Sequence, residues 1–172
     1  DLSFPAHYAY ALLPEIVLST WAMIVLMVDV FQKGSRSAPS SPMMPWLTLV
    51  GIGLAAAANA WIGGLQQVGA QGMIAVDEFR VFSNFVFLLA AALFILISTR
   101  YIDEERLRLG ELYVLVMFAT VGMMVFAGAT ELIAMFIGLE LMSLPIYVLT
   151  GLNRRDQRSA EGALKYFLLG AF

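Results

Sequence analysis

One acid lies inside a long apolar stretch in the second half of the chain. Glu140 occurs in GLELMSLPIYVL, residues 138–149, and no charged residue lies within eight positions on either side. If this stretch crosses a membrane, a carboxylate at its centre costs about 2.5 to 3.5 kcal/mol, and such residues are functional by default. Burial opposes ionisation of a carboxylate and a nearby cation favours it, so Glu140 could bind and release a proton.

The surroundings of Glu140 leave two interpretations open. Pro145 follows five residues later, where it removes a backbone hydrogen bond and loosens the helix, which would admit water or a π-type distortion beside the acid. This favours a proton-binding role. The structural alternative is a protonated Glu140 that only hydrogen-bonds between helices.

Lys165 is the second ionisable residue in an apolar segment, within ALKYFLLG. It lies five or six residues inside its segment, a depth of roughly 8 to 9 Å at the rise of an α-helix. From that depth its long side chain could simply reach the membrane interface. The short connector before it predicts, however, that its helix packs antiparallel beside the one that carries Glu140. The two groups could then influence each other through water without contact.

Composition places the chain among membrane proteins. Of its 172 residues, 60% are hydrophobic and 13% charged, with a mean hydropathy of +0.82, whereas soluble domains have about 45 to 50% apolar and about 25% charged residues. The absence of cysteine excludes disulfides, iron–sulfur clusters and cysteine-based zinc sites within the chain. A net charge of −3 without a basic patch argues against nucleic acid. No nucleotide loop, metal-ligand cluster or activated nucleophile indicates an enzyme in its own right.

Apolar runs of about 20 residues predict membrane-spanning helices. Five runs qualify, at about 11–31, 45–65, 81–99, 112–129 and 132–151, and a sixth begins near residue 159. The last run is still apolar and in helical register at Phe172, without a stop signal. The sequence therefore predicts an all-α, polytopic transmembrane bundle. We expect residues 1–172 to be the N-terminal fragment of a single longer transmembrane domain, with five complete spans and the start of a sixth.

Basic residues predict the orientation of these spans. The first, third and fifth connectors carry eight of the ten lysines and arginines, whereas the even-numbered connectors carry only Arg80. By the positive-inside rule, the odd connectors face the cytoplasm and the N-terminus lies outside.

The remaining charged residues favour structural roles. Glu15 and Asp29, near opposite ends of the first span, are predicted to be interfacial or helix-contact residues. Glu131 follows a tight turn and is predicted to cap the start of the fifth span, where the helix dipole favours an acid. Residues 73–85 mix polar and apolar side chains and could lie partly along the outer surface. His7 has no evident ligand partner, so we expect it at the surface.

Three stretches together are similar to a known family. They are LLPEIVLSTWAMIVLMVDVF, GELYVLVMFATVGMMVFAGATELIAMFIGLELMSLPIYVLTG and RRDQRSAEGALKYFLLGAF. They strongly resemble the N-terminal third of the subunit N family, antiporter-like membrane subunits of proton-pumping NADH:quinone oxidoreductase (respiratory complex I). The resemblance extends over nearly the whole chain. It is most specific from Gly110 to Phe172.

The resemblance implies a function and an assembly. It implies a proton-translocating multi-pass subunit of a bacterial inner membrane, coupled to quinone reduction elsewhere in the complex and bound to other membrane subunits. By position, Glu140 matches the family's essential acid of the fifth helix, and Lys165 matches a lysine of the sixth; both would act as proton relays. The chain itself would bind no cofactor and no metal, while NADH, FMN, iron–sulfur clusters and quinone would belong to other subunits.

Two other readings stay open at this point. Subunits of multi-subunit cation/proton antiporters and of membrane-bound hydrogenases share the fold and the acid. A purely structural membrane subunit would hold partners without moving protons, and neutralising Glu140 and Lys165 would then leave turnover intact.

Overall fold

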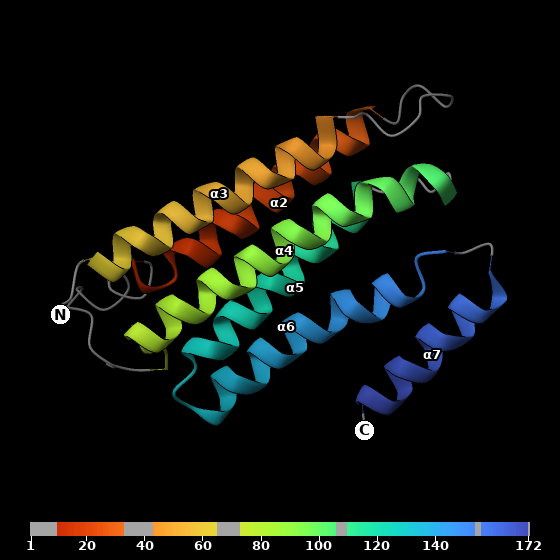
Figure 1. Cartoon of the computed structure of the whole chain (residues 1–172). Helices are drawn as coiled ribbons and strands as arrows, with labels where there is room; N and C mark the ends of the chain where they lie inside the picture. Colours follow the sequence, from red (N-terminus) through yellow and green to blue (C-terminus); the bar gives the residue numbers. More distant parts are fainter. Residues whose placement is uncertain (1–9, 33–42, 65–72, 106–109, 154–155, 172) are drawn as a thin grey trace.

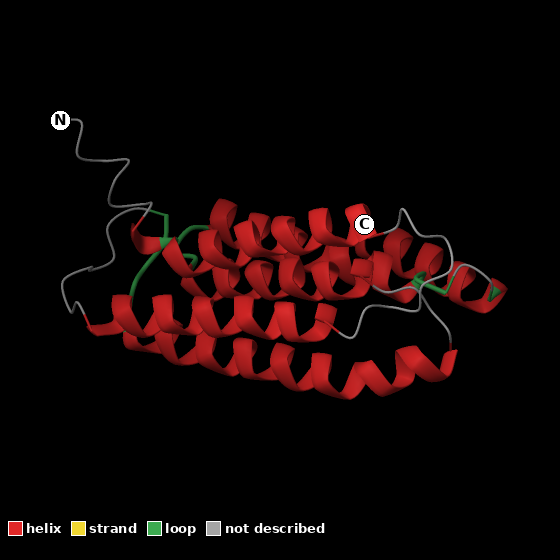
Figure 2. Ribbon diagram, turned by 90° about the horizontal axis from the view of Figure 1, so that it is seen from above, coloured by secondary structure: helices red, strands yellow, loops and turns green. Residues whose placement is uncertain are grey.

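The computed structural model describes residues 10–32, 43–64, 73–105, 110–153 and 156–171. In these ranges the chain forms six α-helices that run back and forth along one common direction (Figures 1 and 2). They are α2 (Leu13–Gln32), α3 (Met43–Gly64), α4 (Glu78–Glu105), α5 (Gly110–Gly128), α6 (Leu132–Thr150) and α7 (Gln157–Ala171). The first five are long and apolar enough to cross a membrane. The predicted all-α bundle of five spans and the start of a sixth is confirmed.

The largest difference from the predicted spans concerns α4. The apolar run predicts a span over 81–99, but the helix extends from Glu78 to Glu105 and includes polar residues from both neighbouring connectors. Asp77 explains the early start, because its carboxylate accepts the backbone N–H of Arg80 at 2.8 Å, as an N-cap residue does. At the other end, the glutamates that follow the apolar run are good helix formers, so the helix continues past it.

Helix α5 is the centre of the bundle. It contacts α2, α3, α4 and α6, and 61% of its membrane-spanning stretch is buried inside the molecule, against 28 to 33% for α2, α3 and α4. A helix that is apolar on all sides is expected in such a place. Helix α6 is packed differently, since its main contacts are with α5 and α7 and it buries 17% of its span.

The backbones of α5 and α6 touch through two glycines. A Cβ atom added at Gly122 would lie 2.6 Å from the Cα atom of Met142, and one added at Gly138 would lie 2.7 Å from the backbone nitrogen of Phe126. Both distances are too short for any side chain. In lipid, where apolar helices gain little from mutual burial, small residues drive association by letting backbones approach. The two glycines therefore fix how α6 lies on α5.

Trp21 joins α2 to α3 in a similar way. Its indole Nε1–H donates to the carbonyl oxygen of Leu47 at 2.8 Å, and its ring lies against Gly51, where a Cβ would clash with it. A partly buried indole needs a hydrogen-bond acceptor, which accounts for a tryptophan in the middle of a span rather than at the interface.

We expect Gly122→Ala to destabilise the α5–α6 contact by about 1 to 3 kcal/mol, the usual effect of overpacking. Thermal unfolding of the purified protein in detergent measures this change. Gly53 of α3 is the matched control, because nothing lies within 4 Å of an added Cβ there. A Gly122→Ala protein as stable as Gly53→Ala would contradict the contact.

Single cysteines test the predicted orientation, since the chain has none of its own. Because successive helices run in opposite directions, Glu131 and Asp156 lie at opposite ends of the bundle. With the N-terminus outside, a membrane-impermeant maleimide added to intact cells should label Glu131→Cys and spare Asp156→Cys. The reverse pattern would show that the orientation is inverted.

Candidate functional site

Glu140 lies half-buried in the middle of α6. Gly138 and Pro145 mark the buried face of α6 that packs on α5. Residues seven apart share a face of a helix, which places Glu140 on the side of Tyr147 rather than on that buried face. Tyr147 packs edge-on against Tyr166 and Phe167 of α7, with ring centroids 4.9 and 5.8 Å apart. Glu140 is thus on the α7 side of α6, about two turns from this aromatic contact.

Within the described residues, Glu140 makes no hydrogen bond and no ion pair. The apolar residues that share its side of α6 are exposed, among them Ile133, Phe136, Ile137 and Leu144. The carboxylate of Glu140 therefore lies on a side of α6 that is apolar and largely uncovered.

Lys165 lies on α7 and is exposed, with 69% of its side-chain surface accessible. Its ammonium group is 2.5 Å from a carboxylate oxygen of Glu161, one turn earlier on the same helix. The structure therefore does not bring Lys165 into contact with Glu140. Helix α7 does pack on α6, where Ser159 Oγ donates to the carbonyl oxygen of Thr150 at 2.7 Å.

Helix α6 continues without interruption through Pro145. The predicted π-type distortion beside the acid is absent from this helix. Proline nevertheless lacks the N–H that would bond to the carbonyl of Leu141, four residues earlier and next to Glu140. That part of the backbone faces α5 at Gly122, so the loosened turn lies at the tight contact between the two helices.

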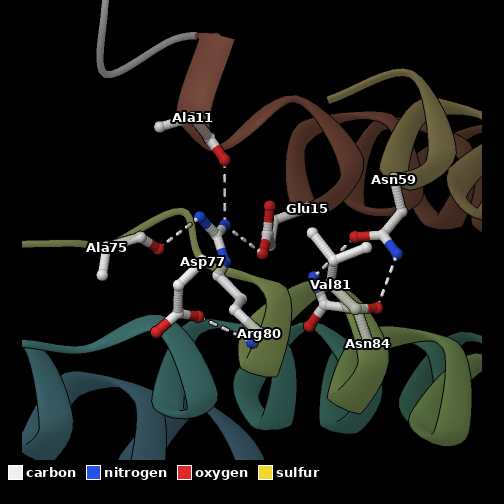
Figure 3. A network of polar contacts seen from close by, with 8 residues as sticks. All are labelled: Ala11, Glu15, Asn59, Ala75, Asp77, Arg80, Val81 and Asn84. Atoms are coloured by element: carbon white, nitrogen blue, oxygen red, sulfur yellow. Dashed lines mark hydrogen bonds and ion pairs between the residues drawn. The ribbon is translucent and has the colours of Figure 1, made fainter. Parts of the chain in front are cut away.

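A second set of charged residues lies at one end of the bundle, where α2, α4 and α6 begin and α3 and α5 end (Figure 3). Arg80 of α4 and Glu15 of α2 are 2% and 3% exposed. Arg80 Nη2 is 2.6 Å from Glu15 Oε1 and also donates to the carbonyl oxygen of Ala11 at 2.9 Å. Its Nη1 donates to the carbonyl oxygen of Ala75 at 3.0 Å. The guanidinium group therefore joins the start of α2 to the segment that leads into α4.

The interpretation of Arg80 as a connector charge needs correction. It is a buried helix residue whose partner, Glu15, lies 65 positions earlier. The predicted helix-contact role of Glu15 agrees with this pair. One signal in the sequence could have found it: Glu15 and Arg80 are opposite charges at ends of two spans that the alternating topology brings to the same side.

Two asparagines extend this polar region into the interface between α3 and α4. Asn59 Nδ2 donates to the carbonyl oxygen of Val81 at 2.9 Å, and Asn84 Nδ2 donates to Asn59 Oδ1 at 3.1 Å. Both asparagines are almost completely buried. Hydrogen bonds of this kind hold membrane helices together at modest gain. A search for runs of apolar residues does not single out either asparagine.

The sequence also predicted structural roles for Asp29, Glu131 and His7. Asp29 lies against Gly110, the first residue of α5, where the helix dipole favours an acid. Glu131 is the N-cap residue of α6, as predicted, but its side chain makes no capping hydrogen bond. His7 lies outside the described residues. Within the described ranges, no group of three or more His, Cys, Asp or Glu residues could hold a metal ion.

Comparison with known proteins finds similarity over most of this chain. A protein named NADH-quinone oxidoreductase subunit N from Trichlorobacter lovleyi is 44% identical over 94% of this chain and 32% of its own length. A protein named NADH-quinone oxidoreductase subunit N 2 from Rhizobium meliloti is 40% identical over 96% of this chain and 34% of its own length. The chain is a homologue of NADH-quinone oxidoreductase subunit N. It spans about a third of the length of these curated relatives.

Two further similarities agree with this homology. A chain of the structure described as respiratory complex I from Thermus thermophilus with bound aureothin superposes with a TM-score of 0.67 at 30% identity, over 92% of this chain and 33% of that one. The sequence profile of the family described as NADH:quinone oxidoreductase/Mrp antiporter, TM, matches residues 129–172, which include both Glu140 and Lys165. This homologue of subunit N is a multi-pass membrane protein, with five candidate spans in its described residues.

Removal of one member of the buried ion pair should be costly. Glu15→Leu or Arg80→Leu leaves a buried charge without its partner, and we expect each to destabilise the protein by about 3 to 5 kcal/mol. The double variant should be less destabilised than the two single changes added together. Thermal unfolding in detergent provides the measurement. The control is Glu78→Gln, because Glu78 is an exposed residue in the first turn of α4. Single variants as stable as this control would mean that the pair is not buried.

Proposed function

We propose that this chain belongs to a proton-translocating membrane subunit of NADH:quinone oxidoreductase, in which Glu140 binds and releases the proton. The observation that carries the proposal is the state of Glu140: a half-buried acid in mid-helix that makes no hydrogen bond or ion pair within the described residues. The homology to subunit N supports it. Quinone reduction would occur in other subunits of the complex and drive the transfer.

The proposed mechanism depends on what lies near Glu140. With a cation close to its carboxylate the acid is ionised, and when that cation moves away or loses its charge the acid takes up a proton. A change of about 1.4 kcal/mol in this interaction alters the ratio of protonated to ionised acid tenfold. Small displacements of a neighbouring helix are therefore sufficient to load and unload the site.

Lys165 is proposed as a second relay residue, with more limited support. It lies on the helix that packs on α6, but its ammonium group is paired with Glu161. It would take part in transfer only after leaving that partner. An exposed ion pair of this kind is weak, worth about 0.3 to 0.5 kcal/mol in water, so the lysine can leave it readily.

The proposed assembly follows from the exposed side of α6. Only 17% of this span is buried, and the curated relatives are about three times as long as the chain. We propose that residues 1–172 are the N-terminal part of one transmembrane domain, whose other helices cover Glu140. The domain would contact other membrane subunits of the complex in a bacterial inner membrane, while NADH, FMN, iron–sulfur clusters and quinone bind elsewhere.

A second candidate is a subunit of a cation/proton antiporter. It is favoured by the matching family profile, whose description includes an Mrp antiporter. The same acid would then exchange protons for a cation without quinone chemistry. Ion dependence separates the two, because an antiporter requires the exchanged cation for proton movement, whereas the proposed subunit requires electron transfer to quinone.

We expect Glu140→Gln, in the complete subunit within its assembled complex, to lower proton pumping severely, because glutamine keeps the side-chain shape but cannot take up a proton. Proton movement into inverted membrane vesicles, driven by NADH, measures the effect. The control is Glu131→Gln, an exposed acid at the start of the same helix. Normal pumping by a fully assembled Glu140→Gln complex would exclude this role and favour a purely structural subunit.

A further inference from the structure

Arg80 contacts the end of α5 as well as its hydrogen-bond partners. A Cβ atom added at Gly128, the last residue of α5, would lie 2.7 Å from both Cδ and Nε of Arg80. The arginine side chain thus lies directly against the end of α5. Glu15 Oε1 and the carbonyl oxygens of Ala11 and Ala75 hold the guanidinium group in that place.

The segment that accepts from Arg80 also binds the turn between α5 and α6. The backbone N–H of Ala75 donates to the carbonyl oxygen of Gly128 at 2.8 Å, and the N–H of Thr130 donates to the carbonyl oxygen of Met73 at 3.1 Å. These bonds form a short antiparallel bridge between Ile74 and Ala129. The start of α6 is therefore attached, through two backbone hydrogen bonds, to the segment that Arg80 holds.

This attachment matters because it holds α6 at its start, whereas the rest of the helix is held mainly by α5 and α7. Glu140 follows the first residue of α6 by eight positions, about 12 Å along the helix. A shift at the turn would move the glycine contacts with α5 and carry Glu140 with them.

We propose that Arg80, held by Glu15, is a positioning residue that fixes the helix carrying Glu140. This inference rests on the proton-transfer function proposed above. Arg80 and Glu15 would act through the turn and would not bind the transferred proton themselves. They hold the turn from which α6 starts, and a guanidinium group suits this task because its planar fork donates to several acceptors at once.

Two mild variants test the proposal in the complete complex. Glu15→Gln removes the charge of the partner but keeps a hydrogen-bond acceptor. Gly128→Ala leaves both charges in place and displaces the Arg80 side chain by its added methyl group. The matched controls are Glu78→Gln, two residues before Arg80 and exposed, and Gly64→Ala, where an added Cβ meets nothing within 4 Å.

Two readouts are needed. Amide hydrogen exchange, followed by mass spectrometry over residues 128–140, should become about tenfold faster in both variants, which corresponds to about 1.4 kcal/mol of lost local stability. Exchange over residues 43–64 should be unchanged. The number of protons moved per electron should fall in the same variants, whereas loss of assembled complex would lower electron transfer and proton movement together.

The outcomes are separable. Faster exchange near α6 with fewer protons per electron supports the proposal. Unchanged exchange in both variants overturns it, and so does faster exchange with the same proton-to-electron ratio as the controls. Glu140→Gln, measured in the same assay, reports independently on the proposed function, because normal pumping there contradicts proton transfer by Glu140 whatever the exchange shows.

Discussion

The contact between α5 and α6 determines where Glu140 lies. In a lipid environment, apolar helices gain little by burying apolar surface against each other, so close backbone packing and a few polar contacts decide their arrangement. Gly122 and Gly138 provide that packing over the two turns around the acid. Helix α5 in turn is held by α2, α3 and α4. The position of one half-buried carboxylate therefore depends on how the helices that precede α6 in the chain are packed.

A connected set of polar contacts lies at one end of the bundle. The Arg80–Glu15 pair, the two buried asparagines and the backbone bridge at Ile74 and Ala129 all lie where α2, α4 and α6 begin. A buried ion pair is weak evidence for stability, because desolvation of both charges offsets much of their attraction. Its contribution here is better understood as geometric. The ion pair determines which segments lie side by side at this end of the bundle, and apolar packing alone would not determine this.

The spans could be predicted because each depends on a local property, a run of about 20 apolar residues. Glu140 could be identified for the same reason, because the neighbouring residues in the sequence show that no other charged residue lies near it. The neighbouring residues alone do not place Arg80, because its burial depends on Glu15, 65 positions away. The extension of α4 to Glu78 depends on a capping aspartate, and the mid-span Trp21 on the carbonyl of Leu47. Long-range partners of single polar groups leave no periodic trace in a sequence.

The central place of α5 has a consequence for biosynthesis. Chains are made from the N-terminus, so α2, α3 and α4 enter the membrane before the helix that packs against all three of them. Until α5 arrives, α3 contacts both α2 and α4, but the faces of these helices that pack on α5 lack that partner. Helix α6 comes last of the five and docks on an already completed core. The proposed proton-binding acid is thus carried by the helix whose insertion can be delayed without disturbing the helices before it.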